Sequence, residues 1–245
     1  NVSYAQREPK PRDVYDPQDF WSVPLNASGH FNPSPSANDY VGPSLKPEKL
    51  VDIELGTQWA WKGLNLGANL YYLSLRDEQV PYGALDNLGL YIPINAKETV
   101  HQGLEFVAGA EPVPNLRVTG NLAVADDYFV HHQELIGTDS LGYGIYASRN
   151  GNRIAFDPLY VANARVQYDY RGATAGFGVR SVGEQYIDNT QDEATAVPAY
   201  TLVSLDLGYR FTRIPGLAAA DLKLRVNNLF DTEYEAFGYN YPDPR

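Results

Sequence analysis

Residues 64–72, Leu-Asn-Leu-Gly-Ala-Asn-Leu-Tyr-Tyr, alternate between two kinds of side chain. Leu64, Leu66, Ala68 and Leu70 fall on one parity, and asparagine and glycine fall between them. A period of two is that of a β-strand, because successive side chains point to opposite faces. The stretch therefore predicts a strand with one apolar face and one face that meets water or polar groups.

The same alternation returns along most of the chain, and this repetition predicts the fold. Further strands are expected at 1–7, 51–61, 104–111, 116–124, 160–170, 173–180, 203–211 and 222–227. Together with 64–72 these make about nine strands. We predict an all-β chain built as one long antiparallel up-and-down sheet.

The connections between these strands are alternately short and long. Short turns are expected at 62–63, 112–115, 171–172 and 212–217, and long connections at 9–48, 81–97, 131–156 and 188–197. The two kinds therefore lie at opposite ends of the sheet. Transmembrane barrels of the outer-membrane type have this asymmetry, with short periplasmic turns and long extracellular loops.

Aromatic residues on the apolar parity lie directly before the short turns. They are Trp59, Trp61, Tyr168, Tyr170, Tyr209 and Phe211. Such positions are typical of the aromatic girdle at a membrane interface. The alternative is a sandwich whose core aromatics gather near the strand ends, but sandwich strands are usually shorter than these.

Composition narrows the class of protein. The 245 residues contain no cysteine, which excludes disulfides and thiol chemistry, and no methionine, which predicts a fragment or a processed product. With 19 basic and 30 acidic residues, the net charge of -11 argues against a nucleic-acid partner, because a phosphate backbone requires a positive surface.

Several short motifs resemble, in order, those of TonB-dependent outer-membrane receptors. The main one is the closing stretch 224–234, Leu-Arg-Val-Asn-Asn-Leu-Phe-Asp-Thr-Glu-Tyr, which is similar to the family's penultimate-strand signature. Others are Leu45-Lys-Pro-Glu48 with Ile53-Glu-Leu-Gly56, Gln102-Gly-Leu-Glu105, Val182-Gly-Glu-Gln-Tyr186, Pro198-Ala-Tyr-Thr-Leu-Val203 and Ser3-Tyr-Ala-Gln6. They cover nearly the whole chain.

The resemblance implies that residues 1–245 are the C-terminal portion of a larger barrel, of about 22 strands. The plug domain and the last strand are expected to lie outside this sequence. The resemblance further implies an active transporter in the outer membrane of a Gram-negative bacterium. It would bind and import a scarce large solute, a ferric siderophore above all, with energy from the TonB complex, and without a cofactor or enzymatic activity.

The polar parity carries charges of both signs, which suits a lumen wall that pairs with a plug. The expected plug-facing residues are Glu54, Glu105, Arg117, Arg165, Arg180, Asp206 and Arg225. A passive pore more often gathers one sign of charge at a constriction. The alternative is a solvated face whose charges pair across strands.

Ligand capture is expected in the long loops, where arginine and aromatic side chains can grip an anionic chelate. The candidates are Trp21, His30, Tyr82, Tyr91, His131, Tyr143, Arg149 and Arg153. Each of them has packing within the loop as its alternative role. We expect no dedicated metal site, because the adjacent His131 and His132 point to opposite sides of an extended segment.

Two other functions remain open at this level. A small passive porin-like barrel should have an even number of strands and its own terminal aromatic residue. A soluble β-rich ligand-binding module should carry polar residues on its exposed parity. The apolar parity here predicts contact with membrane lipid. As a separate molecule, the fragment would have two unpaired sheet edges and a large exposed hydrophobic face, so it should aggregate in water.

Overall fold

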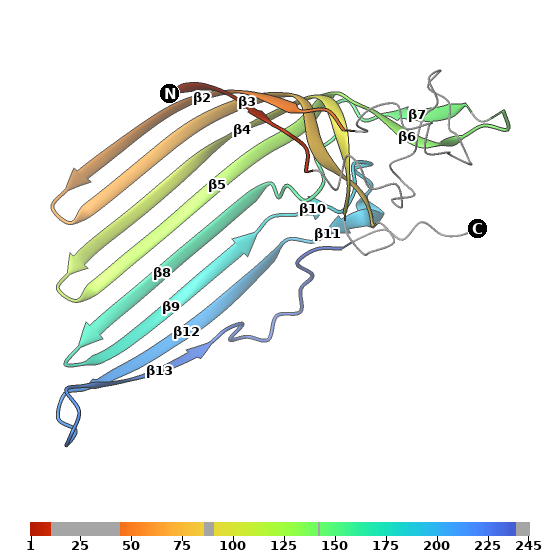
Figure 1. Cartoon of the computed structure of the whole chain (residues 1–245). Coiled ribbons are helices and arrows are strands. Elements are labelled where there is room, and N and C mark those ends of the chain that lie inside the picture. Colours follow the sequence, from red (N-terminus) through yellow and green to blue (C-terminus); the bar gives the residue numbers. More distant parts are fainter. Residues whose placement is uncertain (11–44, 86–90, 142, 239–245) are drawn as a thin grey trace.

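The computed structural model describes residues 1–10, 45–85, 91–141 and 143–238, with side chains at all of these except 82–85, 91, 92 and 138. One antiparallel sheet of nine strands dominates this part of the chain, in the order β1-β2-β3-β4-β5-β8-β9-β12-β13 (Figure 1). The strands are β1 Val2–Arg7, β2 Glu48–Trp61, β3 Leu64–Leu85, β4 Tyr91–Val113, β5 Leu116–His131, β8 Tyr160–Tyr170, β9 Ala173–Val182, β12 Tyr200–Phe211 and β13 Ala220–Val226. The predicted up-and-down sheet is confirmed.

Smaller elements lie in the long connections. Two hairpins pair outside the main sheet, β6 Gln133–Thr138 with β7 Gly144–Ser148, and β10 Gln185–Tyr186 with β11 Ala196–Val197. A single turn of 3-10 helix, Glu193–Thr195, precedes β11. None of the described helical residues forms a helix long and apolar enough to cross a membrane.

The short turns are tight because their residues adopt left-handed backbone conformations. Lys62 and Gly63 have φ of 41° and 83°, and Arg171 and Gly172 have 48° and 87°. Two consecutive positive φ values define the turn that matches the twist of the flanking strands. These turns lie together at one end of the sheet, and β6, β7, β10 and β11 lie at the other (Figure 1).

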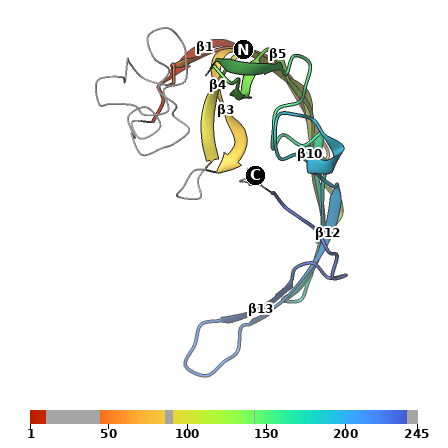
Figure 2. The same cartoon turned by 90° about the vertical axis from the view of Figure 1, so that its right-hand side faces the viewer.

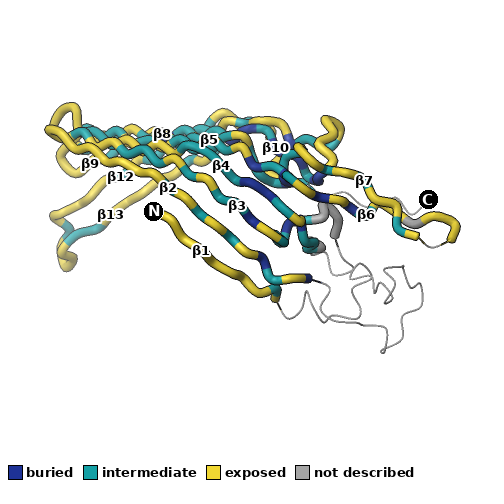
Figure 3. The backbone as a smooth tube through the Cα atoms, turned by 90° about the horizontal axis from the view of Figure 1, so that it is seen from above, coloured by how far each residue is buried: buried dark blue, intermediate teal, exposed yellow. Residues whose placement is uncertain are grey.

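The sheet is a single curved layer over most of its length (Figure 2). Leu55 is 72% exposed and Leu70 is 52% exposed, although they pair on the neighbouring strands β2 and β3, away from the ends of both. We call the face that carries these residues the apolar face, and the opposite one the polar face. Within the described residues no second layer covers the apolar face, and buried positions gather toward the loop end (Figure 3).

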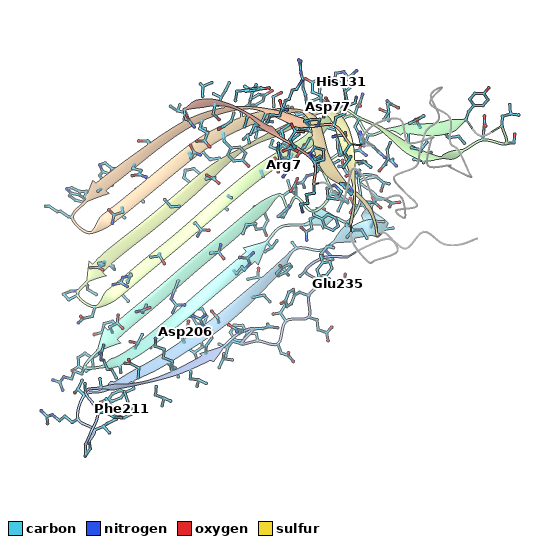
Figure 4. All side chains as sticks on the ribbon, in the orientation of Figure 1. Arg7, Asp77, His131, Asp206, Phe211 and Glu235 are labelled. Atoms are coloured by element: carbon cyan, nitrogen blue, oxygen red, sulfur yellow. The ribbon has the colours of Figure 1, made fainter. Side chains whose placement is uncertain are left out.

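The predicted girdle aromatics lie on the apolar face next to the short turns. Ring centroids are 6.2 Å apart for Trp59 and Trp61, and 4.7 Å apart for Tyr209 and Phe211. Phe211 lies at the extreme short-turn end, and all four rings are exposed (Figure 4). Large amphipathic rings in this position are those of a membrane interface.

In the part of the chain that the structure describes, the hydrophobic core is a small cluster at the loop end. It consists of Val80, Ala96, Phe129 and Ile154, all at most 3% exposed. Here the ends of β3 and β4 turn away from the plane of the sheet toward its hollow side (Figure 2). Because β3 runs to Leu85 and β4 begins at Tyr91, the predicted long connection at 81–97 is wrong. β3 and β4 extend beyond the membrane-spanning part of the sheet. There the lipid no longer requires an apolar side chain at every second position, so the alternation in the sequence ends before the strands do.

Candidate functional site

Two carboxylates on the polar face have no cationic partner among the described residues. Glu105 of β4 faces Asn69 of β3, whose amide donates a 3.4 Å hydrogen bond to it. Glu54 of β2 lies two residues before Gly56, which faces Asn69 from the other side. No ion pair reaches either carboxylate from the residues that the structure describes. Gly56 and Gly67 leave room beside them, and together they line a hollow of about 430 Å³.

The other half of the polar face carries a network around one aspartate. Asp206 of β12 accepts hydrogen bonds from Arg165 of β8, at 2.6 Å, and from Arg225 of β13 (Figure 4). Arg165 crosses β9 at Gly176, where an added Cβ would lie 2.8 Å from its guanidinium. Glycine at this point is what lets two non-adjacent strands share an ion pair.

The predicted plug-facing residues therefore share one face but differ in sign along it. The acids without a cation lie on β2 and β4, whereas the arginines lie on β5 to β13. Of these arginines, Arg117 pairs with Glu111 at 3.5 Å, and Arg180 makes no ion pair with any described residue. A partner in the lumen would meet an acidic side and a basic side.

A second cluster lies at the loop end, also on the polar side. The His101 ring on β4 contacts the Glu78 carboxylate through Nε2, at 3.0 and 3.1 Å, and Asp127 of β5 through Nδ1, at 3.2 Å. Asp157, in the segment before β8, brings a carboxylate within 4.8 Å of His101 and Asp127. Glu78 also accepts from the Thr99 hydroxyl.

This cluster lies beyond the apolar band. On the apolar face, the neighbouring residues Gln102 and Asp126 are joined by a 2.9 Å hydrogen bond, and such a polar pair marks the end of the surface that suits lipid. Burial, followed by the negative charge of Asp127, raises the pKa of Asp157 to about 7. Burial alone would lower the pKa of His101, but hydrogen bonds to Asp127 and Glu78 outweigh burial and raise it to about 10. The cluster therefore holds a protonated imidazole among its carboxylates.

The predicted loop candidates are spread over several places. Trp21 and His30 lie outside the described residues, and the side chains of Tyr82 and Tyr91, on β3 and β4, are not described either. His131 is exposed and contacts Glu98 at 3.0 Å (Figure 4). Tyr143 is 48% exposed beside the start of β7.

The two loop arginines have partners within the protein. Arg149 forms an ion pair with the buried Glu134 and so ties β6 to the end of β7. Arg153 donates a 3.1 Å hydrogen bond to the backbone carbonyl of Asp157. Their assignment as ligand-binding residues stays a prediction, and for Arg149 the ion pair would have to be broken.

His132 is buried between these elements and does not share the surroundings of His131. It is 4% exposed and its ring stacks on Phe129 with centroids 4.8 Å apart. Burial, and then the charge of Arg149, lowers the pKa of His132 to about 4. The two adjacent histidines therefore point into different environments, as the extended backbone predicts.

Glu78, His101, Asp127 and Asp157 were not among the candidates that the sequence offers. His101 and Asp127 do share the parity of the polar side chains of β4 and β5, so their common face could be found from alternation. Glu78 follows Asp77, whose positive φ of 53° interrupts that alternation. Asp157 comes from a separate connection, and nothing in the sequence pairs it with the others.

Comparison with known proteins agrees with this architecture. A family model described as "TonB dependent receptor-like, beta-barrel" matches residues 13–229. The chain belongs to the TonB-dependent receptor β-barrel family. Its polar face is therefore the wall of a barrel lumen, its apolar face meets lipid, and its location is the outer membrane of a Gram-negative bacterium.

Individual relatives match most of the chain. It is 28% identical over 220 residues to the metal-pseudopaline receptor CntO of Pseudomonas aeruginosa, which covers 88% of this chain and 28% of that protein. The pesticin receptor of Yersinia enterocolitica is 26% identical over 230 residues, covering 90% of this chain and 31% of that protein. The chain thus spans less than a third of the length of these relatives.

A solved structure shares the fold at lower identity. The siderophore receptor PiuA from Acinetobacter baumannii superposes with a TM-score of 0.62 at 21% identity, covering 97% of this chain and 30% of that chain. Because the chain is part of a TonB-dependent receptor barrel, its polar face lines the lumen. The hollow lined by Glu54 and Glu105 and the network around Asp206 both lie on this face. The His101 cluster lies in the same wall, at the end where the long loops emerge.

Proposed function

We propose that residues 1–245 are the C-terminal portion of the barrel of an active outer-membrane transporter. The complete protein binds a ferric siderophore at its extracellular loops and imports it with energy from the TonB complex. It is a transporter and has no enzymatic activity. The observation that carries the proposal is the polar face of a chain from the TonB-dependent receptor β-barrel family, on which Glu54 and Glu105 line a hollow and form no ion pair with any described residue.

Physical reasoning supports a plug against this wall. A barrel of this class is too wide for its own side chains to fill, so an ungated lumen would leak. No described residue forms an ion pair with either carboxylate, so a positively charged group from a second domain could pair with them without displacing an internal partner. The basic side, around Arg165 and Arg225, would receive acidic groups from the same partner.

The names of relatives support the class of solute. The similar proteins include receptors for metal-pseudopaline, for ferrichrome and for catecholate siderophores. These solutes are large chelates, which suits capture by long loops and passage through a wide barrel. A passive porin-like function would need a lumen that remains open, and a soluble ligand-binding module would need a polar outer face in place of exposed residues such as Leu55 and Leu70.

Uptake measured in cells tests the proposal directly. The gene that encodes the complete receptor is deleted in its own bacterium, and uptake of radioactive iron is measured with catecholate, hydroxamate and citrate chelates under iron limitation. We expect uptake of at least one chelate to be lost on deletion, restored by the gene, and abolished by a second deletion of TonB. Uptake that persists without TonB, or swelling of liposomes that contain the intact receptor, would identify a passive pore instead.

The plug contact is tested at the acidic hollow. Glu54→Gln with Glu105→Gln should loosen the plug and raise the sensitivity of cells to an antibiotic too large for porins. Glu111→Gln is the matched control, because its carboxylate is exposed and already lies 3.5 Å from Arg117. Equal sensitivity of the double variant and the control would refute the contact.

A further inference from the structure

We infer that His101, Asp127 and Asp157 form a binding site for a divalent transition-metal ion of the zinc type, which is held in the wall of the barrel. Three separate segments supply the three ligands: β4, β5 and the segment before β8. One ligand atom of each lies within 4.8 Å of the others. Ligands around tetrahedral zinc lie about 3.3–3.5 Å apart, so closure by about an ångström completes the set.

The histidine is oriented for this role by Glu78. Both carboxylate oxygens of Glu78 lie at hydrogen-bond distance from Nε2 of His101, at 3.0 and 3.1 Å. This contact and the 3.2 Å contact of Nδ1 with Asp127 direct both ring N–H groups at carboxylates, so the ion would replace the proton on Nδ1 and bind there beside Asp127 and Asp157. A carboxylate behind a ligating histidine is the usual arrangement at metal sites, where it fixes the ring and raises its basicity. Glu78 is thus a positioning residue.

Asp127 supplies a second observation that points to a cation site. It is only 6% exposed, and its Oδ1 makes no hydrogen bond to any described group, although it lies 3.2 Å from Nδ1 of His101. A buried carboxylate oxygen without a hydrogen bond is costly. A metal ion between Oδ1 and Nδ1 would satisfy both atoms at once.

Beside the protonated ring of His101, the cluster still carries an excess of carboxylates. Glu78, Asp127 and Asp157 bring three carboxylates to one imidazole. Arg153 is the nearest guanidinium with a described contact here, and it donates to the backbone carbonyl of Asp157 and forms no ion pair with the carboxylate. One imidazole with two carboxylates suits zinc and its neighbours, whereas calcium and magnesium prefer oxygen ligands alone.

The ion would stabilise the barrel wall by linking separate segments of it, and it would not be transported. Its ligands are largely buried, and they join the inward-turned end of the β3–β4 hairpin to β5 and to the segment that leads into β8. Loss of the ion would free that hairpin from its neighbours. The inference holds whether or not the proposed transport of siderophores is correct, because it concerns the wall and not the solute.

Zinc titration of the complete receptor tests the site. The receptor is extracted from outer membranes in detergent, stripped with a chelator, and titrated with Zn²⁺ against a chromophoric chelator. We expect Asp157→Asn to remove one bound ion per receptor, and Glu78→Gln to weaken the same ion by about 10–100-fold. Glu98→Gln, which makes the same chemical change beside the exposed His131, should leave the titration unchanged.

Thermal melting distinguishes the loss of the metal site in Asp157→Asn from misfolding of the variant. Asp157→Asn removes a buried negative charge next to Asp127, so the metal-free variant should melt at or above the temperature of the metal-free wild type, and Zn²⁺ should raise only the melting temperature of the wild type. His101→Gln provides a second variant with the same expected loss of one ion. An equal number of bound ions in wild type, Asp157→Asn and His101→Gln would overturn the inference. Saturation of the site by Ca²⁺ in preference to Zn²⁺ would overturn it as well.

Discussion

Replacing Leu70 with arginine should destabilise the barrel by about 2–4 kcal/mol, the cost of an arginine at the midplane on the lipid face. Leu70 lies on the apolar face between Leu55 and Leu104 of the neighbouring strands. It follows Leu64, the first residue after a short turn, by six positions. At about 3.3 Å per residue and a tilt near 45°, this places it about 14 Å along the membrane normal. The apolar band of such barrels is about 25 Å tall, so Leu70 lies close to its centre.

The assay is guanidinium unfolding of the complete receptor in lipid vesicles, with the midpoint and slope followed by tryptophan fluorescence. Leu64→Arg is the depth control, because the same change on the same face at the interface should cost at most about 1 kcal/mol. Asn69→Arg is the facing control, since its side chain would enter the lumen beside Glu105 and should cost about as little. The assignment of the two faces fails if Leu70→Arg costs no more than Leu64→Arg, or if Asn69→Arg costs as much as Leu70→Arg.

Three further predictions concern single positions. Gly103→Ala would put a carbon 2.3 Å from a backbone carbonyl oxygen and should prevent assembly of heat-modifiable receptor on a gel, whereas Gly109→Ala meets open space and should assemble normally. Asp206→Asn should lower the free energy of unfolding by about 1–3 kcal/mol, because Arg165 and Arg225 both lose a charged acceptor. In the same denaturation assay, the control Asp221→Asn should lower it by less than about 1 kcal/mol, because Asp221 is exposed and pairs with one exposed arginine. Because the pKa of His132 is lowered to about 4, the unfolded β6–β7 hairpin binds a proton below about pH 6.5, whereas the folded hairpin binds it only near pH 4. Amide hydrogen exchange in β6 and β7 should therefore become faster, relative to its intrinsic rate, as the pH falls from about 6.5 to 4. Unchanged protection over this range would show that the His132 ring is not buried in solution.

The sequence predicts the membrane-spanning part of this fold well because lipid on one face and the aqueous lumen on the other fix the polarity of alternate residues. Lipid requires Leu64, Leu66 and Leu70 on one parity, and the lumen tolerates only polar or small residues between them. The same rule finds the lumen positions of Glu54 and Glu105. Which of these charges are paired cannot be read in this way, because pairing depends on strand register and on openings such as Gly176, through which Arg165 reaches Asp206.

Prediction fails at the loop end for a physical reason. Beyond the apolar band, the residues of β3 and β4 do not alternate regularly between apolar and polar, so the stretch 81–97 has the composition of a loop although all of its described residues are strand. A bend at Asp77 brings Glu78 to His101, and the chain returns 56 positions after His101 to add Asp157. Such a cluster is a property of the folded chain alone.

The uneven distribution of charge on the lumen wall limits how a partner can sit against it. On the basic side, Asp206 already neutralises much of the charge of Arg165 and Arg225, so an acidic group arriving there has to compete with an internal ion pair. On the acidic side, Glu54 and Glu105 have no such internal competitor among the described residues. A cation from the partner gains more at the acidic hollow than an anion gains at Arg165 and Arg225, because Asp206 already shares the charge of these two arginines. A contact of the partner with Arg165 and Arg225 should therefore release before its contact with Glu54 and Glu105.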